Sequence, residues 1–217
     1  MIFLTLYTGL SGAMIEKGVS PLCGKIGEKI FDERITIVDD GTLKDGIYSM
    51  PFDDEGTKAQ KTVLFENGVL KSHIHSLRTA EKLGCAPTGN GLKQANSSSG
   101  KALGAIQRPN ISNWVMTPGN IAYEDMIKDI KDGVIIDEIM GLFTSNLLNG
   151  DFAGNIGTGY LIKDGKIVGR AKDAAINANI YNIFNNNLVG IGDKAIVTDG
   201  HHLPYIMLKD IYIAGKK

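Results

Sequence analysis

The chain has 217 residues, of which 43% are hydrophobic and 22% are charged, and its formal net charge is −1. This length is enough for one large domain or two small ones with a substantial core. The near-neutral charge argues against direct nucleic-acid binding, because phosphate contacts need clustered lysines and arginines.

Two further features bear on the cellular compartment. No run approaches the ~20 apolar residues of a membrane span, and residues 1–7 lack the basic residues of a signal peptide. Cys23 and Cys85 lie far apart and form no CxxC motif, which is typical of reduced thiols. We therefore expect a cytoplasmic protein without membrane contact.

The first half of the chain shows strand, helix and turn patterns. An Asn67-Gly68 pair between two strand-like runs predicts a two-residue hairpin, because a type I′ turn needs φ > 0 at both central residues. The expected elements are a buried strand at 2–6, a helical segment at 8–31 interrupted at Ser20-Pro21, a strand at 34–39, a hairpin of strands 63–66 and 69–74, and a helix at 76–83.

The second half begins with a long polar stretch, residues 87–109, which we expect to be the least ordered part of the chain. After it we expect a strand at 111–116, a turn and helix at 117–131, a strand at 134–140, a hairpin turning at Asp164-Gly165, a helix at 177–184, and strands at 188–191 and 205–213. Short strands joined by hairpins among a few helices indicate an α+β domain with a mainly antiparallel sheet. A barrel-like closure of that sheet is one expectation.

The glycine-rich segment at 149–168 is the most unusual part of the sequence. Glycine within a strand marks a bulge, a bend or the close approach of another backbone. If this strand has an accessible edge, an extended peptide could add to it through main-chain hydrogen bonds. The candidate peptide-binding residues are Gly150, Asp151, Phe152, Gly157, Gly159 and Tyr160. The alternative is that these glycines only permit tight packing, and the sequence weighs the two equally.

Acidic and histidine residues are the other candidates for a site. Adjacent carboxylates at 53–55 suit either a metal site or an acidic turn that accepts local backbone N–H groups, and we favour the turn. His73 and His75 would share one face of a strand, whereas His201 and His202 are expected in an exposed loop. Neither pair has the spacing of a helical zinc motif.

Several short segments together resemble the C-terminal domain of the TldD/TldE family, whose TldE members are also called PmbA. They are MPFDDEG at 50–56, TVLFENGVLK at 62–71, PTGN at 87–90, TPG at 117–119, the glycine-rich block at 149–168 and PYIMLKDIYIAG at 204–215. The resemblance covers about residues 2–215.

The resemblance implies a metallopeptidase family that digests unfolded peptides and trims peptide precursors. TldD-like members carry a helical HExxxH motif, in which two histidines bind zinc and the glutamate serves as base. The corresponding segment here, a strand near 2–7 followed by residues 8–17, contains no histidine. The resemblance therefore implies a TldE/PmbA-type chain with no catalytic residues or metal ligands of its own.

The same resemblance implies a dimer with a TldD-like subunit, which would hold the zinc, or with an identical copy. Family members have been called modulators of DNA gyrase, although no residue pattern here supports DNA contact. They are typically about twice as long, so residues 1–217 correspond to their C-terminal domain without the N-terminal α/β domain. Two alternatives remain at this stage: a free-standing peptide-binding module, or a hydrolase with a metal at residues 53–55 and the distant histidines.

Overall fold

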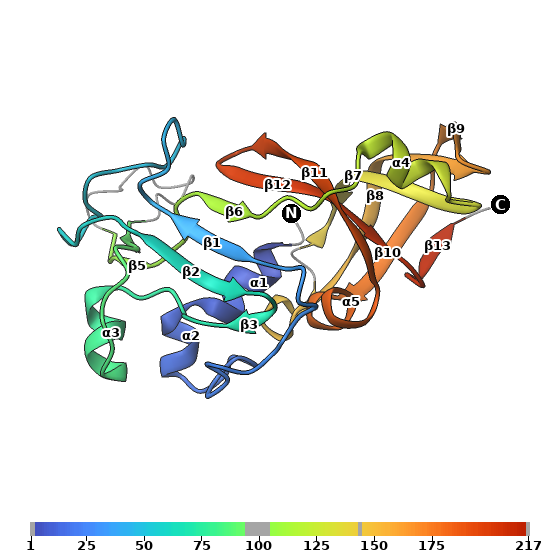
Figure 1. Ribbon diagram of the computed structural model, residues 1–217. Coiled ribbons are helices and arrows are strands. Elements are labelled where there is room, and N and C mark those ends of the chain that lie inside the picture. The colour runs from blue at the N-terminus through green and yellow to red at the C-terminus, as the bar shows by residue number, and fades with distance from the viewer. Residues whose placement is uncertain (1–2, 94–104, 143–144, 216–217) are drawn as a thin grey trace.

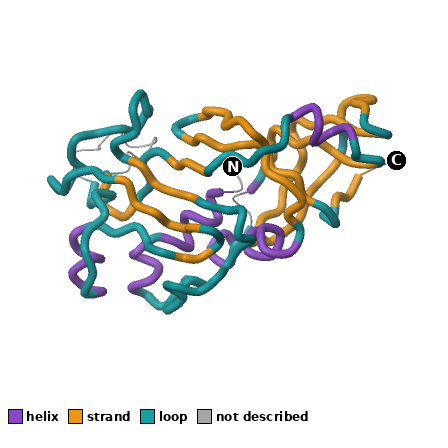
Figure 2. Tube along the Cα trace, in the orientation of Figure 1, coloured by secondary structure: helices purple, strands orange, loops and turns teal. Residues whose placement is uncertain are grey.

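The computed structural model describes residues 3–93, 105–142 and 145–215, and its elements are drawn in Figures 1 and 2. The helices are α1 (Phe3–Leu10), α2 (Gly12–Glu16), α3 (Leu77–Leu83), α4 (Tyr123–Lys128), the 3-10 helix η3 (Leu147–Asn149) and α5 (Ile180–Asn186). The strands are β1 (Ile37–Asp40), β2 (Lys61–Glu66), β3 (Val69–Leu70), β4 (Gly91–Leu92), β5 (Arg108–Pro109), β6 (Trp114–Met116), β7 (Asp132–Met140), β8 (Asp151–Lys163), β9 (Lys166–Arg170), β10 (Ala174–Asn179), β11 (Leu188–Thr198), β12 (His201–Leu208) and β13 (Ile213–Gly215).

Two large sheets organise the molecule. One has six strands in the order β11-β12-β6-β1-β2-β3, and the other has the order β13-β10-β8-β7 with β9 paired to β8. Pairing is antiparallel except between β12 and β6. The second sheet occupies the right-hand half of Figure 1, while β1 to β3 lie in the left-hand half. The α+β class with a mainly antiparallel sheet is therefore confirmed, and among the described strands neither sheet closes into a barrel.

Tight turns follow the dipeptides that predicted them. Asn67 and Gly68 have φ of 49° and 76°, and Asp164 and Gly165 have φ of 46° and 72°, as type I′ hairpins require. A third hairpin, which the sequence analysis missed, joins β11 to β12 and carries the same kind of pair at 199–200. This turn also lines a cavity.

The N-terminal prediction was wrong. Residues 3–10 form helix α1 rather than a strand, because a short apolar run does not distinguish a buried strand from a buried helix. The helix is interrupted at Ser11, and α2 begins at Gly12, whose N–H donates to Ile74 O at 2.7 Å. The helix expected to reach residue 31 ends at Glu16, since Gly18 and Gly24 have φ of 68° and 72°, outside the helical range.

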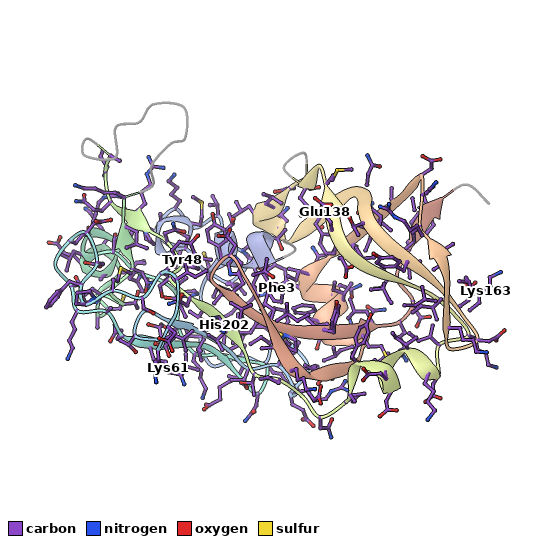
Figure 3. The ribbon with its side chains drawn as sticks, turned by 90° about the horizontal axis from the view of Figure 1, so that it is seen from above. Phe3, Tyr48, Lys61, Glu138, Lys163 and His202 are labelled. Atoms are coloured by element: carbon purple, nitrogen blue, oxygen red, sulfur yellow. The ribbon has the colours of Figure 1, made fainter. Side chains whose placement is uncertain are left out.

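A single hydrophobic core joins both sheets. Phe3 of α1 packs against Trp114 of the six-stranded sheet and against Phe184 of α5, with ring centroids 6.1 and 5.7 Å apart. Figure 3 shows Phe3 near the middle of the molecule. Phe152 of β8 is 1% exposed and belongs to the same cluster. Helix α1 is thus fixed by burial against both sheets.

The expectation that the polar stretch at 87–109 is the least ordered part of the chain stays a prediction. Residues 94–104 lie outside the described residues, and the flanks pair as β4 and β5. Among the described residues, no helix has the length and apolarity needed to cross a membrane.

Candidate functional site

A cavity of about 550 Å³ opens among segments that are distant in sequence. Its walls come from α1, the loop between β1 and β2, the end of β4, the connection from β5 to β6, and the β11–β12 turn. The side chains that give it chemical character are Tyr7, Tyr48, Asp54, Lys93, Asp199 and His201. We call it the Tyr48 cavity.

The β11–β12 turn brings Asp199 to Tyr48. The Tyr48 hydroxyl donates a hydrogen bond of 2.8 Å to Asp199 Oδ1, and its backbone N–H donates to Asn113 Oδ1 at 3.0 Å. Gly200 has φ of 75°, and a Cβ built there would meet the Tyr48 ring. The absence of a side chain at Gly200 therefore allows the tyrosine to lie over the turn. Asp199 and this bond raise the pKa of the Tyr48 hydroxyl.

A buried carboxylate supports the wall of the Tyr48 cavity. Asp39 accepts hydrogen bonds from Ser112 N at 2.7 Å, Ser112 Oγ at 2.9 Å and Asn90 Nδ2 at 2.6 Å. Burial raises its pKa to about 6, against the lowering effect of these donors, and neighbouring Asp40 raises it further. Ser112 is 1% exposed and its hydroxyl is bound to Asp39, so it is poorly placed to act as a nucleophile.

The acidic run at 53–55 forms a turn, as favoured from sequence. Asp53 accepts two backbone N–H groups of its own turn, at 3.0 and 2.8 Å, and a third from Gly91 at 2.8 Å. Asp54 accepts from Lys93 N at 2.7 Å, and Glu55 accepts from the first backbone N–H of α3 at 2.7 Å. All three carboxylates therefore hold backbone N–H groups in place, and that of Glu55 holds the start of helix α3. Only Asp54 also lines the Tyr48 cavity.

The histidines fall into two separate places. His73 and His75 are each 5% exposed, and their rings stand nearly perpendicular with centroids 6.1 Å apart. His201 and His202 were expected in a loop but begin β12, where both are half-buried. Burial lowers the pKa of His201, and its Nδ1 has no hydrogen-bond partner. Within residues 3–93, 105–142 and 145–215, no three histidines, cysteines or acids are grouped to hold a metal.

The six residues predicted to bind peptide lie in a different part of the molecule. Gly150 ends η3, and the others lie on β8, which pairs with β10 over 151–155, with β7 over 155–163 and with β9 over 160–163. Phe152 is in the core, and Asp151 Oδ1 accepts a bond of 2.8 Å from Asn179 Nδ2. The described lining of the Tyr48 cavity includes none of the six.

The glycines of β8 sit close to neighbouring groups. A Cβ at Gly159 would lie 2.8 Å from Ile135 O, and one at Gly157 would lie 2.9 Å from Glu138 Oε2. This crowding supports the packing alternative, and an interior strand leaves little edge for an added peptide. Peptide binding by these six residues stays a prediction.

Sequence reasoning missed Tyr48, Asp199, Asp39 and Ser112. The Asp-Gly pair at 199–200 was a usable signal, since the same kind of pair predicted the hairpin at 164–165. Nothing in the local sequence marks Tyr48.

Comparison with known proteins gives the family. Residues 1–215 match the family model described as the PmbA/TldA metallopeptidase C-terminal domain. The chain belongs to this family. It is 37% identical over 179 residues to a metalloprotease of Methanothermobacter thermautotrophicus, covering 82% of this chain and 37% of that protein. It is 26% identical over 215 residues to the metalloprotease PmbA homolog of Buchnera aphidicola, covering 99% of this chain and 44% of that protein.

Solved structures agree. TldE from Thermococcus kodakarensis superposes with a TM-score of 0.87 at 30% identity, covering 99% of this chain and 47% of that chain. A putative modulator of DNA gyrase from Thermotoga maritima gives a TM-score of 0.83 at 29% identity, covering 98% and 46%. This PmbA/TldA-family chain thus spans less than half the length of each of these relatives.

Proposed function

We propose that this chain is the TldE/PmbA-type, non-catalytic part of a cytoplasmic TldD/TldE-type metallopeptidase that acts on unfolded peptides and peptide precursors. Its partner in the dimer is a TldD-like subunit that holds the zinc, or an identical copy. The observation that carries the proposal is helix α1. It leads into residues 8–17, where the family resemblance places the zinc motif. Helix α1 contains no histidine or acid, and residues 8–17 contain no histidine and a single acid, Glu16.

What α1 does present is Tyr7, which lines the Tyr48 cavity. Helix α1, which leads into the segment related to the zinc motif, therefore forms part of a wall of a cavity, and this supports a binding role. A volume of about 550 Å³ lies within the range of pockets that enclose ligands the size of a short peptide segment.

The polar groups of the Tyr48 cavity suit a peptide backbone. Asp54 and Asp199 can accept from peptide N–H groups or a terminal ammonium, and Lys93 can donate to a carbonyl. These contacts do not select side chains, which fits varied peptides. Among the lining serines, Ser112 bonds a carboxylate, but it is 1% exposed, so we assign its bond to Asp39 a structural role. Zinc held by the partner would supply the activated water.

Metal content tests whether this chain or its partner subunit holds the zinc. We expect no stoichiometric zinc in the purified chain by plasma mass spectrometry, and zinc together with peptidase activity after co-expression with a TldD-like partner. Zinc at one equivalent per chain, with peptidase activity in the chain alone, contradicts the proposal.

A matched pair of variants tests the cavity itself. Asp199→Asn keeps a residue that tolerates the φ of 48° but removes the charge, and we expect about tenfold weaker peptide binding by the complex. Asp173→Asn is the control, because Asp173 is also an exposed aspartate with φ of 50° but lies outside the cavity. Equal behaviour of the two variants would remove the Tyr48 cavity from the proposal, while the zinc result would still decide the non-catalytic role.

A further inference from the structure

Three tyrosines and one aspartate lie together beside helix α4. Tyr123 is the first residue of α4, Tyr205 lies on β12, Tyr160 on β8 and Asp137 on β7. The Tyr123 and Tyr205 rings have centroids 4.7 Å apart, and the Tyr205 hydroxyl lies 3.5 Å from Asp137 Oδ1. Tyr160 is near enough to act electrostatically on both of these tyrosine hydroxyls. We call the four residues the tyrosine cluster; Figure 1 shows α4, β7 and β8 together in the right-hand half of the molecule.

Two members of the cluster come from irregularities in the strand ladders. The register of β7 against β8 shifts between Ile136 and Glu138, and that of β11 against β12 shifts over residues 191–195. Within the described strands, these shifts leave Asp137 and Tyr205 without a directly paired residue on the neighbouring strand. A bulge redirects a side chain and is frequent next to functional sites. Here one bulge in each sheet leads to the same place.

The charged groups around the tyrosine cluster are acidic. Burial raises the pKa of the Tyr123 hydroxyl, and Asp137 and Glu124 raise it further. Burial and then Asp137 also raise the pKa of Tyr205. Neither acid forms an ion pair within the part of the chain that the structure describes. The cluster therefore presents negative charge that no described ion pair balances.

These features suit an organic cation. The three tyrosines are half-buried and Asp137 is exposed, so part of each residue remains accessible. The face of a tyrosine ring attracts a cation that lies within about 6 Å of its centre. A metal ion fits less well, because tyrosine hydroxyls with a raised pKa stay protonated at neutral pH and the cluster supplies one carboxylate. An apolar ligand would remove water from Asp137 without replacing its hydrogen bonds.

Among the organic cations that proteins present, the arginine guanidinium combines the two contacts. Its planar face stacks on aromatic rings, and its N–H groups donate to a carboxylate. We propose that the tyrosine cluster binds a guanidinium group, which stacks on a tyrosine ring and pairs with Asp137. The group belongs to free arginine or to an arginine of a peptide. None of the four residues lines the Tyr48 cavity or lies in the zinc-motif segment, so the inference does not depend on the proposed function.

The test uses NMR of the chain with ¹³C-labelled tyrosine rings, of which there are seven. The probes are N-acetyl-arginine methylamide, its citrulline counterpart, which has the same shape without the charge, and an acetylated pentapeptide amide with arginine between glycines. We expect saturable shifts of the Tyr123 and Tyr205 resonances with the arginine probe and none with the citrulline probe. Tighter binding of the pentapeptide identifies a peptide as the source of the guanidinium, and weaker binding identifies free arginine.

Variants assign the contacts. Asp137→Asn should weaken binding of the arginine probe about tenfold, which is the effect of losing one hydrogen bond to a charged group. Tyr123→Leu keeps an apolar side chain but removes the ring, and should weaken binding about fivefold, within the range of a cation–π contact. It also assigns the Tyr123 resonance. Asp129→Asn is the matched control, because Asp129 is also an exposed aspartate but follows the other end of α4. Thermal melting checks that each variant is folded.

Four results overturn the proposal. They are the absence of saturable shifts with the arginine probe and the pentapeptide, equal shifts with the citrulline probe, unchanged affinity in both Asp137→Asn and Tyr123→Leu, and an equal loss of affinity in Asp137→Asn and Asp129→Asn.

Discussion

The Tyr48 cavity, of about 550 Å³, has a counterpart of about 560 Å³ that lies against strand β2 and is lined by Lys61, Lys71, His73 and His75 among others. Two carboxylates line the Tyr48 cavity, whereas none lines the second cavity. In the Tyr48 cavity the carboxylates are already bound: Asp199 by the Tyr48 hydroxyl, Asp54 by Lys93 N, and buried Asp39 behind the wall by Ser112. Beside the second cavity, the enclosed Thr62 hydroxyl has no hydrogen-bond partner among the described residues, and each cavity also has one unpartnered ring nitrogen, His201 Nδ1 or His75 Nδ1. Carboxylates that accept hydrogen bonds thus shape the first cavity, whereas two lysines and two buried histidines line the second.

The two regions also differ in how protons affect them. Burial raises the pKa of Asp39 to about 6 and lowers that of His75 to about 4. Each shift favours the neutral form, as expected where the charged form loses hydration. Acidification should therefore raise the stability contributed by Asp39 and lower the stability contributed by His75. Single variants can separate the two contributions.

The largest effect is expected from Asp39→Ala. The change leaves the Ser112 N–H, the Ser112 hydroxyl and the Asn90 amide without their acceptor, and we expect a loss of about 3–5 kcal/mol in unfolding free energy. Urea unfolding followed by fluorescence of the only tryptophan, Trp114, measures it. Asp54→Ala is the control, since exposed Asp54 accepts a single bond and should change stability by no more than about 1 kcal/mol. A similar loss in both variants would mean that the buried carboxylate has no special role.

Stability against pH gives the next largest effect. The pKa of His75 in the folded protein is about 4, below the ordinary 6.5, so its contribution is complete above pH 6.5 and is lost as the pH falls toward 4. The pKa of Asp39 in the folded protein is about 6, above the ordinary 3.8, so acidification from pH 6 toward pH 4 increases stability. Each shift corresponds to at most about 3 kcal/mol over this window.

Because these contributions oppose each other, single variants should reveal them. His75→Gln should make the protein gain stability on acidification relative to the parent, and Asp39→Asn should make it lose stability. Urea midpoints at pH 7, 6, 5 and 4 provide the comparison, with His202→Gln as the control. If both variants follow the parent curve, neither residue titrates abnormally.

Gly200→Ala should have an intermediate effect. The φ of 75° is unfavourable for alanine, and the added Cβ would press on the Tyr48 ring, so we expect a loss of about 2 kcal/mol and weaker binding in the Tyr48 cavity. Gly24→Ala is the matched control, because its φ of 72° imposes the same backbone strain while a Cβ there meets nothing within 4 Å. Thermal melting of both variants tests this. An equal loss of stability in the two variants would mean that the contact between a residue-200 side chain and the Tyr48 ring has no cost.

What the sequence could predict was local. The turns at 67–68 and 164–165 follow from dipeptides that tolerate positive φ, and the acidic turn at 53–55 follows from carboxylates that accept nearby backbone N–H groups. The first helix could not be predicted, because residues 3–10 are buried on most sides and an apolar run carries no periodicity to read.

The two cavities could not be predicted, because long-range contacts create them. Tyr48 and Asp199 are 151 residues apart, and Asp39 and Ser112 are 73 apart. Without the pairing of the six-stranded sheet, nothing indicates that these residues meet. The candidate glycines of β8 illustrate the converse, since their pattern was conspicuous in sequence while the fold places them in an interior strand.

The smallest expected effect has the opposite sign. Thr62→Val removes a buried hydroxyl that has no partner in the part of the chain that the structure describes, so the protein should become more stable by about 1 kcal/mol. Thr88→Val, its matched control, removes a hydroxyl that bonds both His75 N and His75 O, and should lower stability by about 1 kcal/mol. Thermal melting of the two purified variants measures both changes in stability. A loss of stability in Thr62→Val would show that the hydroxyl already serves the fold. A gain would show that the hydroxyl costs stability, because a buried polar group without a partner gives up its hydration on folding and gains no hydrogen bond in return.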